Sequence, residues 1–326
     1  MTKDDVDAFF ARRGELNPES YLELDFIFEC AGDPRVAAAH LASEQSTAQW
    51  KRVGVDEDFR PRFAAKVVDF DATPRDAFSY PVSVETRGAV HACRVTIAHP
   101  HENFGARLPN LMSAVMGEGV FFAPGIPLIR LQDIRFPDSY LSHFEGPQFG
   151  IAGFRDMLQV FGRPIFFGVV KPNIGLPPEA FAQLALQGWQ GGLDVAKDDE
   201  MLADTSWSPL AERARLLGDK RRQAEAESGV PKVYLANITD DVDQLTTQHD
   251  VAVAAGANAV MVNAMPVGVS GVRMLRRRAT VPIVTHFPFI ASFSRLAAHG
   301  VHSRVFTRLQ RMAGADVIIM PGFGER

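Results

Sequence analysis

From about residue 151 to the last residue, short apolar segments alternate with helical segments, and this rhythm constrains the fold more than any other feature. The apolar segments are rich in β-branched residues and show no polar alternation, which is typical of parallel strands covered on both faces. We expect six strands, at 164–170, 193–196, 233–238, 259–263, 282–285 and 315–320. We expect helices between them, at 178–189, 209–227, 242–255, 268–278 and 301–313.

A series of strand–helix units fits two α/β folds, a (β/α)8 barrel (TIM barrel) and a doubly wound parallel sheet. No GxGxxG sequence leads from a strand into a helix, which weighs against the dinucleotide-binding form of the doubly wound sheet. The strands alone do not decide between the two folds.

Residues 1–150 show a different pattern, with strands and helices mixed and separated by Pro and Gly. Apolar and polar residues alternate at 21–29, as in a half-buried strand, and we expect further strands at 62–71, 80–85, 90–97 and 126–136. Helical patterns cover 34–43 and 108–116. This predicts an α+β (ferredoxin-like) domain with an antiparallel sheet over 1–150, followed by an α/β domain over 151–326.

Composition excludes several classes of protein. The chain has 46% hydrophobic and 22% charged residues, which is ordinary for a globular protein. The formal net charge of −5 means that basic residues are not in excess, so we expect no nucleic-acid partner. No apolar run reaches the ~18 residues of a membrane span, and the polar, acidic start is unlike a signal peptide. We expect a cytoplasmic protein without a membrane partner.

Polar and ionisable residues follow five successive apolar segments of the second domain. In a barrel the carboxyl ends of the strands form the open face that carries function, so this coincidence points to a site. The residues concerned are Lys171 and Asn173, the run Lys197-Asp198-Asp199-Glu200, Asn237, Asn263 and His286.

The run from Lys197 to Glu200 places three carboxylates in succession after a buried strand. Such groups repel one another unless a cation neutralises them, and Mg²⁺ prefers carboxylate oxygens. The alternative is a solvated acidic turn that caps the next helix. Lys171 is either a buried proton carrier or a lysine at the rim of the sheet with its ammonium in solvent. His286 is either a general acid or base, or a core histidine with both nitrogens satisfied.

Two segments resemble signature segments of the RuBisCO large-chain family, GVVKPNIGL at 168–176 and GGLDVAKDDE at 191–200. Shorter matches in the same order are EQSTAQW at 44–50, LQDIRFP at 131–137, FEGP at 144–147, YLAN at 234–237 and GVHSRV at 300–305. The resemblance covers roughly residues 20–324. It implies an N-terminal α+β domain, a C-terminal (β/α)8 barrel and an active site shared across a homodimer.

The resemblance also implies roles for individual residues. Lys197 matches the lysine that takes up CO2 to become a carbamate, which binds Mg²⁺ together with Asp199 and Glu200. An ammonium has no lone pair to offer a metal, whereas a carbamate offers an anionic oxygen. Lys171 matches the proton-transferring lysine and His286 an active-site histidine. The positions implied for substrate binding are Glu44, which reaches into the partner's site, Asn173 and Asn237.

Four positions depart from the carboxylating members of the family. Those enzymes carry a second lysine at Asn173, an arginine at Phe287, a histidine near Ile319 and an asparagine at Glu118. The arginine and the histidine bind the far phosphate of the substrate. Each charge-assisted hydrogen bond lost is worth roughly 1.5–3 kcal/mol, so a bisphosphate should be a poor substrate here.

We therefore expect a RuBisCO-like protein, a Mg²⁺-dependent enolase, isomerase or decarboxylase acting on a ketose phosphate or a sugar-acid phosphate. Two alternatives stay open, a true ribulose bisphosphate carboxylase and a non-catalytic scaffold or regulatory protein. Residues 151–326 make up 176 residues against about 250 for a typical barrel. We expect the chain to be a fragment that stops after about strand six, lacks the last phosphate-binding loops and is inactive as it stands.

Overall fold

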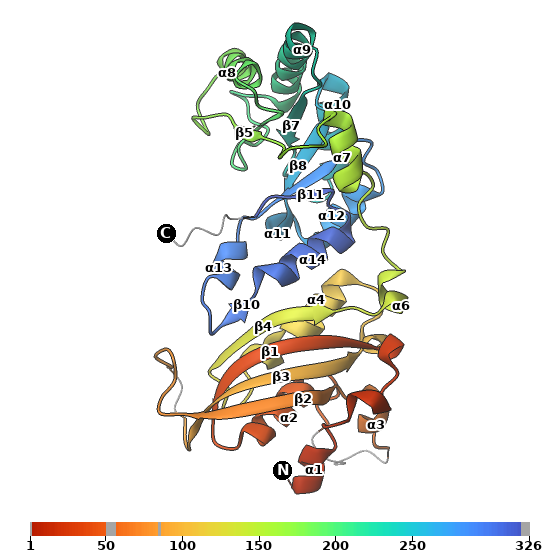
Figure 1. The fold of residues 1–326 in the computed structure, drawn as a ribbon, viewed down its shortest axis with the longest axis vertical. Helices are drawn as coiled ribbons and strands as arrows, with labels where there is room; N and C mark the ends of the chain where they lie inside the picture. Colours follow the sequence, from red (N-terminus) through yellow and green to blue (C-terminus); the bar gives the residue numbers. More distant parts are fainter. Residues whose placement is uncertain (1, 50–56, 84–85, 321–326) are drawn as a thin grey trace. The chain divides into compact units, whose positions relative to one another are not determined.

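The computed structural model describes residues 2–49, 57–83 and 86–320. The chain divides into two compact units (Figure 1). Unit 1 consists of Met1–Phe144 and Ile290–Arg308, and unit 2 of Glu145–Phe289 and Leu309–Arg326. The segment Ile290–Arg308 thus leaves the second half of the sequence and folds with the first.

Unit 1 contains a five-stranded sheet in the order β10-β4-β1-β3-β2. β1 pairs antiparallel with β3 and with β4, β2 pairs antiparallel with β3, and β10 adds a short parallel edge to β4. The strands are β1 (Tyr21–Ala31), β2 (Lys66–Arg75), β3 (Val90–Pro100), β4 (Leu128–Arg135) and β10 (Gly300–Val301).

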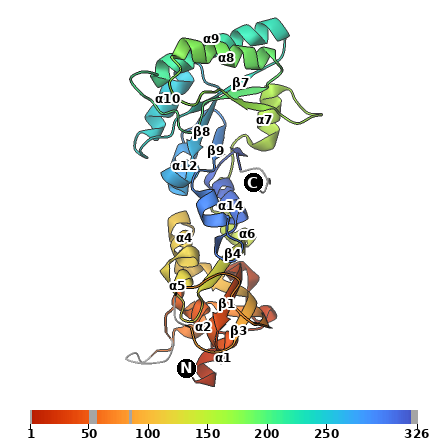
Figure 2. The ribbon, with the colours of Figure 1, turned by 90° about the vertical axis from the view of Figure 1, so that its left-hand side faces the viewer.

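Residues of β1 alternate strictly between buried and half-buried, as the sequence pattern predicts. The buried set, which includes Leu22, Phe26 and Phe28, forms the core face of the sheet. Figure 2 shows α4 and α5 beside β4. The helices of this unit are α1 (Lys3–Asp7), α2 (Pro34–Glu44), α3 (Arg60–Phe63), α4 (Leu108–Met116), α5 (Glu118–Phe121), α6 (Asp138–Leu141) and α13 (Ile290–Ser294).

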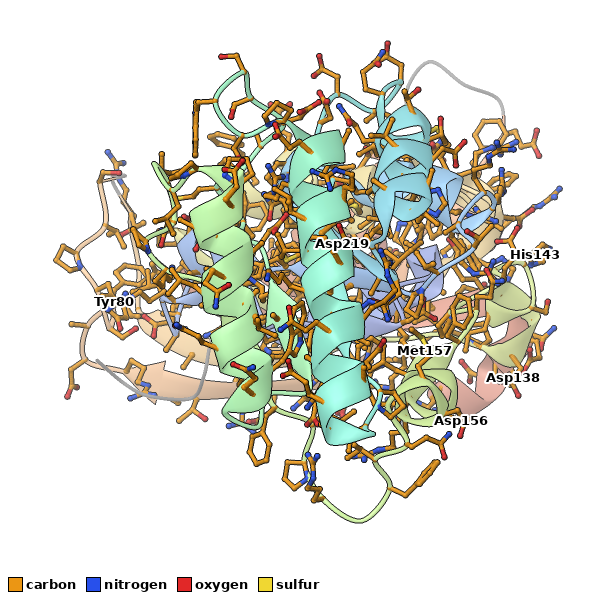
Figure 3. The ribbon with its side chains drawn as sticks, turned by 90° about the horizontal axis from the view of Figure 1, so that it is seen from above. Tyr80, Asp138, His143, Asp156, Met157 and Asp219 are labelled. Carbon is orange, nitrogen blue, oxygen red and sulfur yellow. The ribbon has the colours of Figure 1, made fainter. Side chains whose placement is uncertain are left out.

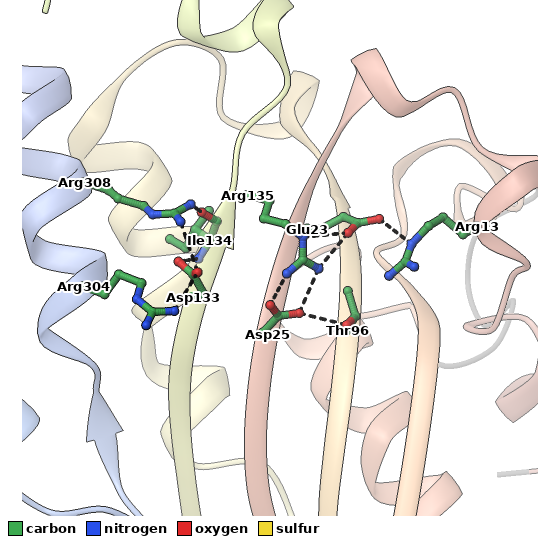
Figure 4. A network of polar contacts seen from close by, with 9 residues as sticks. All are labelled: Arg13, Glu23, Asp25, Thr96, Asp133, Ile134, Arg135, Arg304 and Arg308. Atoms are coloured by element: carbon green, nitrogen blue, oxygen red, sulfur yellow. Dashed lines mark hydrogen bonds and ion pairs between the residues drawn. The ribbon is translucent and has the colours of Figure 1, made fainter.

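Charged side chains attach the segment Ile290–Arg308 to the sheet (Figure 4). Arg304 Nη1 and Arg308 Nη2 lie 3.3 Å and 3.2 Å from the same oxygen, Asp133 Oδ2. Arg135, two residues further along β4, bridges Glu23 and Asp25 of the neighbouring strand β1. The sequence does not predict β10, because a two-residue strand carries no periodicity.

Unit 2 contains six parallel strands in the order β11-β9-β8-β7-β6-β5. Sequence neighbours are therefore spatial neighbours throughout, as in a barrel, whereas a doubly wound sheet reverses its strand order. The strands are β5 (Phe167–Val169), β6 (Val195–Lys197), β7 (Val233–Asn237), β8 (Ala259–Asn263), β9 (Ile283–His286) and β11 (Val317–Ile318). The expected fold, an N-terminal α+β unit followed by a barrel-type series of six strands, is confirmed.

Helices connect these strands, and α8 and α9 lie side by side in Figure 3, where Asp219 marks α9. The helices are α7 (Gly150–Leu158), α8 (Pro178–Gln190), α9 (Leu210–Ser228), α10 (Leu245–Ala255), α11 (Ala264–Val267), α12 (Val269–Arg276) and α14 (Ser303–Ala313), which runs across the boundary of the two units. No helix among the described residues is long and apolar enough to cross a membrane.

One hydrophobic cluster fills the inner face of the six-stranded sheet. Phe154 and Leu158 of α7 pack there against every second residue of the central strands. These strand residues are Val195, Val233, Leu235, Ala259, Met261 and Val284. We call this side of the sheet the inner face. Because side chains alternate between the two faces of a strand, residues two or four positions further along the strand point to the inner face as well.

Two predicted elements of unit 1 differ from the structure. The strand expected at 80–85 is absent from Tyr80 to Ser83, while Val84 and Glu85 lie outside the described residues. Pro81 offers no N–H to a ladder, and Ser79 instead donates from its backbone N–H to Glu29 Oε2 at 2.8 Å. The strand expected from residue 62 begins at Lys66, because Arg60–Phe63 forms a helical turn with proline at its start.

A buried lysine in unit 1 predicts a pH dependence of stability. Lys66 Nζ donates to Ala8 O at 2.6 Å and Arg60 O at 3.0 Å, and burial lowers the Lys66 pKa to about 8. An unfolded lysine keeps its proton up to about pH 10.4. Between these values the unfolded chain binds more protons, so the free energy of unfolding should rise with pH by on the order of 2 kcal/mol.

Urea denaturation of the wild type and of Lys66→Met between pH 7.5 and 9.5 measures this rise. The variant should be less stable throughout, because Ala8 O loses its donor and Arg60 O keeps only the Ala64 N–H, but it should lack the rise with pH that the wild type shows. Equal pH slopes for the two proteins would contradict this account of Lys66.

Candidate active site

The inner face of the sheet changes from apolar to polar at the carboxyl ends of the strands. Two residues after a core residue, each strand presents a polar side chain on the same face. Lys197 follows Val195, Asn237 follows Leu235, Asn263 follows Met261, and His286 follows Val284. The spacing gathers the polar side chains that end β6, β7, β8 and β9 at one edge of the parallel sheet.

Lys171, two residues after the end of β5, makes the shortest ion pair of the site. Its Nζ lies 2.6 Å from Asp199 Oδ2 and donates to Asn173 Oδ1 at 2.5 Å. The Lys171 side chain is 54% exposed, whereas that of Asp199 is fully buried. The structure thus shows Lys171 at the rim and not buried, and its proton-transferring role stays a prediction.

Asp199 keeps its negative charge although it is buried. Burial acts to raise its pKa, but hydrogen bonds from Lys171 Nζ and from the backbone N–H of Met201 hold the pKa of Asp199 below its ordinary value. The carboxylate therefore stays ionised at neutral pH, as a ligand for a cation must.

Lys197 is a buried amine next to carboxylates. Its Nζ donates to the backbone oxygen of Asp198 at 2.8 Å and lies 4.0 Å from Glu200 Oε2. Burial lowers the pKa of Lys197 even though Glu200 and Asp199 act to raise it. A larger fraction of this side chain is therefore the neutral, nucleophilic amine than in an exposed lysine.

His286 lies near the same oxygen of Glu200, with Nε2 3.7 Å from Glu200 Oε2. Its ring stacks on Phe287, with centroids 4.6 Å apart, and burial lowers the pKa of His286, so the imidazole is neutral at pH 7. The Nδ1 atom is buried, and no hydrogen-bond partner for it occurs among the described residues. His286 is thus not a core histidine with both nitrogens satisfied.

Two asparagines fix the backbone of the loop that carries the carboxylates. Asn237 Nδ2 donates to the backbone oxygens of Asp199 and Glu200, each at 3.2 Å. Asn263 Nδ2 donates to the backbone oxygen of Glu200 at 2.9 Å. The Oδ1 of Asn237 accepts from Thr239, so in this structure both amide atoms of Asn237 bond within the protein. Its substrate-binding role remains a prediction.

Asp198, between the two inward residues, points to the opposite face. Its carboxylate accepts from Arg213 Nε at 3.1 Å, from the Tyr234 hydroxyl at 3.1 Å and from the Asn237 backbone N–H at 3.0 Å. All these groups are buried. Asp198 is therefore held as part of the packing between the sheet and α9.

The acidic run does not cap the following helix. Helix α9 begins ten residues later at Leu210, whose backbone N–H donates to Asp204 Oδ1 at 2.7 Å. Asp199 and Glu200 therefore do not cap this helix, whose N-cap residue is Pro209.

The donor set at this edge fits a magnesium ion once Lys197 carries a carbamate. Among the described residues, no three His, Cys, Asp or Glu side chains are disposed to hold a metal by themselves. Asp199 and Glu200 supply two carboxylates, and a carbamate on the neutral amine of Lys197 would add a third anionic oxygen donor. An all-oxygen set of this kind suits Mg²⁺.

Of the remaining candidate positions, two belong to unit 1 and two to unit 2. Glu44 is the last residue of α2 and Glu118 the first of α5, both in unit 1, and Trp50 of the 44–50 motif lies outside the described residues. Phe287 is half-buried beside His286, and Ile319 packs against the core of the inner face. Neither side chain offers a charge to a phosphate.

The neighbours Asp198 and Asp199 provide a matched pair of variants. Asp198→Asn removes the charge that compensates the fully buried Arg213, so it should lower the free energy of unfolding by on the order of 3–5 kcal/mol. Asp199→Asn releases an exposed ammonium and keeps an acceptor for the Met201 N–H, so it should cost less than about 1 kcal/mol. Urea denaturation measures the free energy of unfolding of both variants. An equal loss of free energy would contradict the assignment of Asp198 to the outer face and of Asp199 to the inner face.

Two family models match the chain. The ribulose bisphosphate carboxylase large chain N-terminal domain matches residues 29–140, and the catalytic domain matches residues 150–325. Ribulose bisphosphate carboxylase-like protein 2 of Rhodopseudomonas palustris is 71% identical over 327 residues, which cover 100% of this chain and 76% of that protein. A relative with a named activity, the 3-oxo-isoapionate-4-phosphate decarboxylase of Rhizobium etli, is 33% identical over 90% of this chain and 71% of its own length.

Solved structures show the same fold. A rubisco-like protein from Burkholderia fungorum superposes with a TM-score of 0.83 at 30% identity, over 91% of this chain and 72% of its own. The dimeric archaeal Rubisco from Hyperthermus butylicus superposes with a TM-score of 0.82 at 27% identity, over 96% of this chain and 71% of its own. The sequence, the fold and both domain matches agree: the chain belongs to the ribulose bisphosphate carboxylase large-chain family, and its similar relatives include RuBisCO-like proteins.

Proposed function

We propose that this chain carries the machinery of a Mg²⁺-dependent enolase, isomerase or decarboxylase acting on a ketose phosphate or a sugar-acid phosphate. The observation that carries the proposal is the gathering of Lys171, Lys197, Asp199, Glu200 and His286 at one edge of the inner face. Lysines beside carboxylates and a neutral imidazole are groups that can serve proton removal next to a carbonyl.

Asp199, Glu200 and the carbamate of Lys197 would hold the ion. Bound there, Mg²⁺ would polarise the substrate carbonyl and stabilise the negative charge of an enolate. Lys197 prepares this site because its lowered pKa favours the neutral amine, which is the form that attacks CO2.

Lys171 is the residue we assign to proton transfer. Its Nζ is exposed at the rim, and Asp199 and Asn173 orient it through hydrogen bonds. In its neutral form Nζ can take a proton from the carbon next to the carbonyl, and as an ammonium it can return one. His286 is fixed by its stacking on Phe287, and its unpartnered Nδ1 can bind a substrate hydroxyl.

The choice of substrate class rests on two positions at which the chain has an apolar residue and no charged partner for a phosphate. Phe287 and Ile319 give a second phosphate no charged partner, which favours a substrate with one phosphate. Loss of CO2 from a 3-oxo acid leads to the same kind of enolate as proton removal. The Rhizobium etli decarboxylase, a relative at 33% identity, supports including decarboxylation in the proposed class.

We further propose a homodimer with a shared active site, in which Glu44 of one protomer serves the site of its partner. The dimeric Rubisco from Hyperthermus butylicus, with a TM-score of 0.82 to this chain, supports this arrangement. Lys197 and its neighbours would then supply one half of each site, and the end of α2 the other.

Metal binding gives the first test. Calorimetry should show that the wild type binds Mg²⁺ and that bicarbonate tightens the binding, because the carbamate supplies a ligand. Lys197→Met and Asp199→Asn should both lose this binding. Lys232→Met is a matched control, because Lys232 is another buried lysine whose Nζ donates to a backbone oxygen, Leu193 O at 2.8 Å. A wild type without bicarbonate-dependent Mg²⁺ binding would favour the non-catalytic alternative.

Proton exchange gives the second test. A panel of ketose phosphates and sugar-acid phosphates, selected by thermal shift with Mg²⁺ and bicarbonate, is followed by NMR in D2O. Exchange of the hydrogen next to the carbonyl, or loss of CO2, should depend on Lys197, and exchange should fall at least 100-fold in Lys171→Met. Undiminished exchange in Lys171→Met would remove the proton-transfer role from this lysine.

Carboxylation separates the proposal from a true ribulose bisphosphate carboxylase. With ribulose bisphosphate and labelled CO2, the protein should form no acid-stable labelled product, because Phe287 and Ile319 leave the second phosphate without charged partners. Fixation of label would overturn our interpretation of these two positions.

A further inference from the structure

Asn263 belongs to the polar residues at strand ends by which the sequence indicates a site, but the sequence gives it no role of its own. It is the last residue of β8, on the inner face, and it pairs in register with His286 of β9. Residues paired in register across parallel strands point to the same face, so Asn263 and His286 stand side by side at the carboxyl edge.

The hydrogen bond that the Asn263 NH2 group donates fixes the orientation of the Asn263 amide. Nδ2 donates to the backbone oxygen of Glu200 at 2.9 Å, and a carbonyl accepts only from the NH2 end of an amide. The other end, Oδ1, is therefore a defined acceptor. It is buried, with 8% of the residue exposed, and no donor for it is found in the part of the chain that the structure describes.

A buried amide oxygen without a donor is unfavourable and needs an explanation. The Nδ1 atom of His286, on the register partner, is also buried and unpartnered. Thr285 Oγ1 is unpartnered too, but Thr285 precedes His286 in the strand and points to the opposite face. Asn263 and His286 thus each contact Glu200 through one nitrogen, Nδ2 and Nε2, and each keeps a second, unpartnered polar atom at the inner edge.

From this we infer that Asn263 is a positioning residue of the cation site. Its Oδ1 accepts a hydrogen bond from a water molecule that the bound Mg²⁺ retains, while its Nδ2 holds the backbone of Glu200. Mg²⁺ dehydrates reluctantly and keeps several waters, and each of these is a strong donor that needs an acceptor. This inference rests on the proposed function, because it takes the ion to be bound by Lys197, Asp199 and Glu200.

The strand itself supplies a matched control. Asn258 lies just before β8, at the opposite end of the strand, and both of its amide atoms are engaged. Its Oδ1 accepts from the Tyr234 N–H at 2.9 Å and its Nδ2 donates to Lys232 O at 3.0 Å. Asn258→Leu should therefore disturb the fold as Asn263→Leu does, yet leave the cation site intact.

Calorimetric titration of Mg²⁺ in bicarbonate tests the inference on the wild type and three variants. Asn263→Leu removes the acceptor and should weaken Mg²⁺ binding by about 10–100-fold, the loss typical when a partner behind the metal ligands is removed. Asn263→Asp keeps an acceptor oxygen but cannot donate to Glu200 O, so it should bind Mg²⁺ at least as tightly as the wild type. Asn258→Leu should bind Mg²⁺ unchanged.

The outcomes separate three accounts. If Asn263→Asp loses affinity as Asn263→Leu does, the residue only pins the Glu200 backbone and the inference is overturned. Wild-type affinity in Asn263→Leu also overturns it, while leaving the proposed function standing. A wild type that binds no Mg²⁺ in bicarbonate overturns the proposed function and this inference together. Circular dichroism on each variant confirms that the folded protein is being titrated.

Discussion

The two-residue period of a parallel strand is the constraint on which the candidate site depends. At the end of β6 it sends Lys197 and Asp199 to the inner face and Asp198 to the outer one. The three residues are adjacent in sequence and have unrelated surroundings. Asp198 neutralises a buried arginine from α9, whereas Asp199 meets an exposed lysine from the end of β5. The same period places Asn237, Asn263 and His286 beside them.

The division of the side chains between the inner and the outer face determines the surroundings of each ionisable group. Inner-face burial disfavours charge on the Lys197 amine and on the His286 ring, and the pKa of each is lowered. Asp199 is buried as well, but hydrogen bonds keep it ionised. The edge therefore combines an amine and an imidazole whose charged forms burial disfavours with the ionised carboxylate of Asp199, which is the combination that carbamate formation and cation binding both need. A site open to water throughout would hold these groups at their ordinary pKa values.

Much of the fold could be predicted from the sequence, because strand and helix periods are strong in unit 2. Helix Leu108–Met116 and strand Ala259–Asn263 have the predicted bounds. The misses have local causes. Pro81 prevents a strand at 80–83, and β10 is too short for any pattern. The pairing of Ile290–Arg308 with unit 1 depends on Asp133 meeting Arg304 and Arg308 across more than 160 residues, which no local pattern encodes.

The candidate site was predictable in its residue types and only partly in its contacts. Polar residues at strand ends, Asn263 among them, indicate an edge, and the two-residue period of a strand would also have separated Asp198 from Asp199. The exposure of Lys171 and the unpartnered Nδ1 of His286 depend on the folded arrangement and could not be predicted from the sequence.

The central claim is that Lys197 forms a carbamate beside Asp199 and Glu200. The direct measurement is ¹³C NMR of the protein with ¹³C-bicarbonate and Mg²⁺. A carbamate resonance that is present in the wild type and in Lys232→Met and absent in Lys197→Met is the predicted result. No such resonance in the wild type, or one that persists in Lys197→Met, would contradict the account.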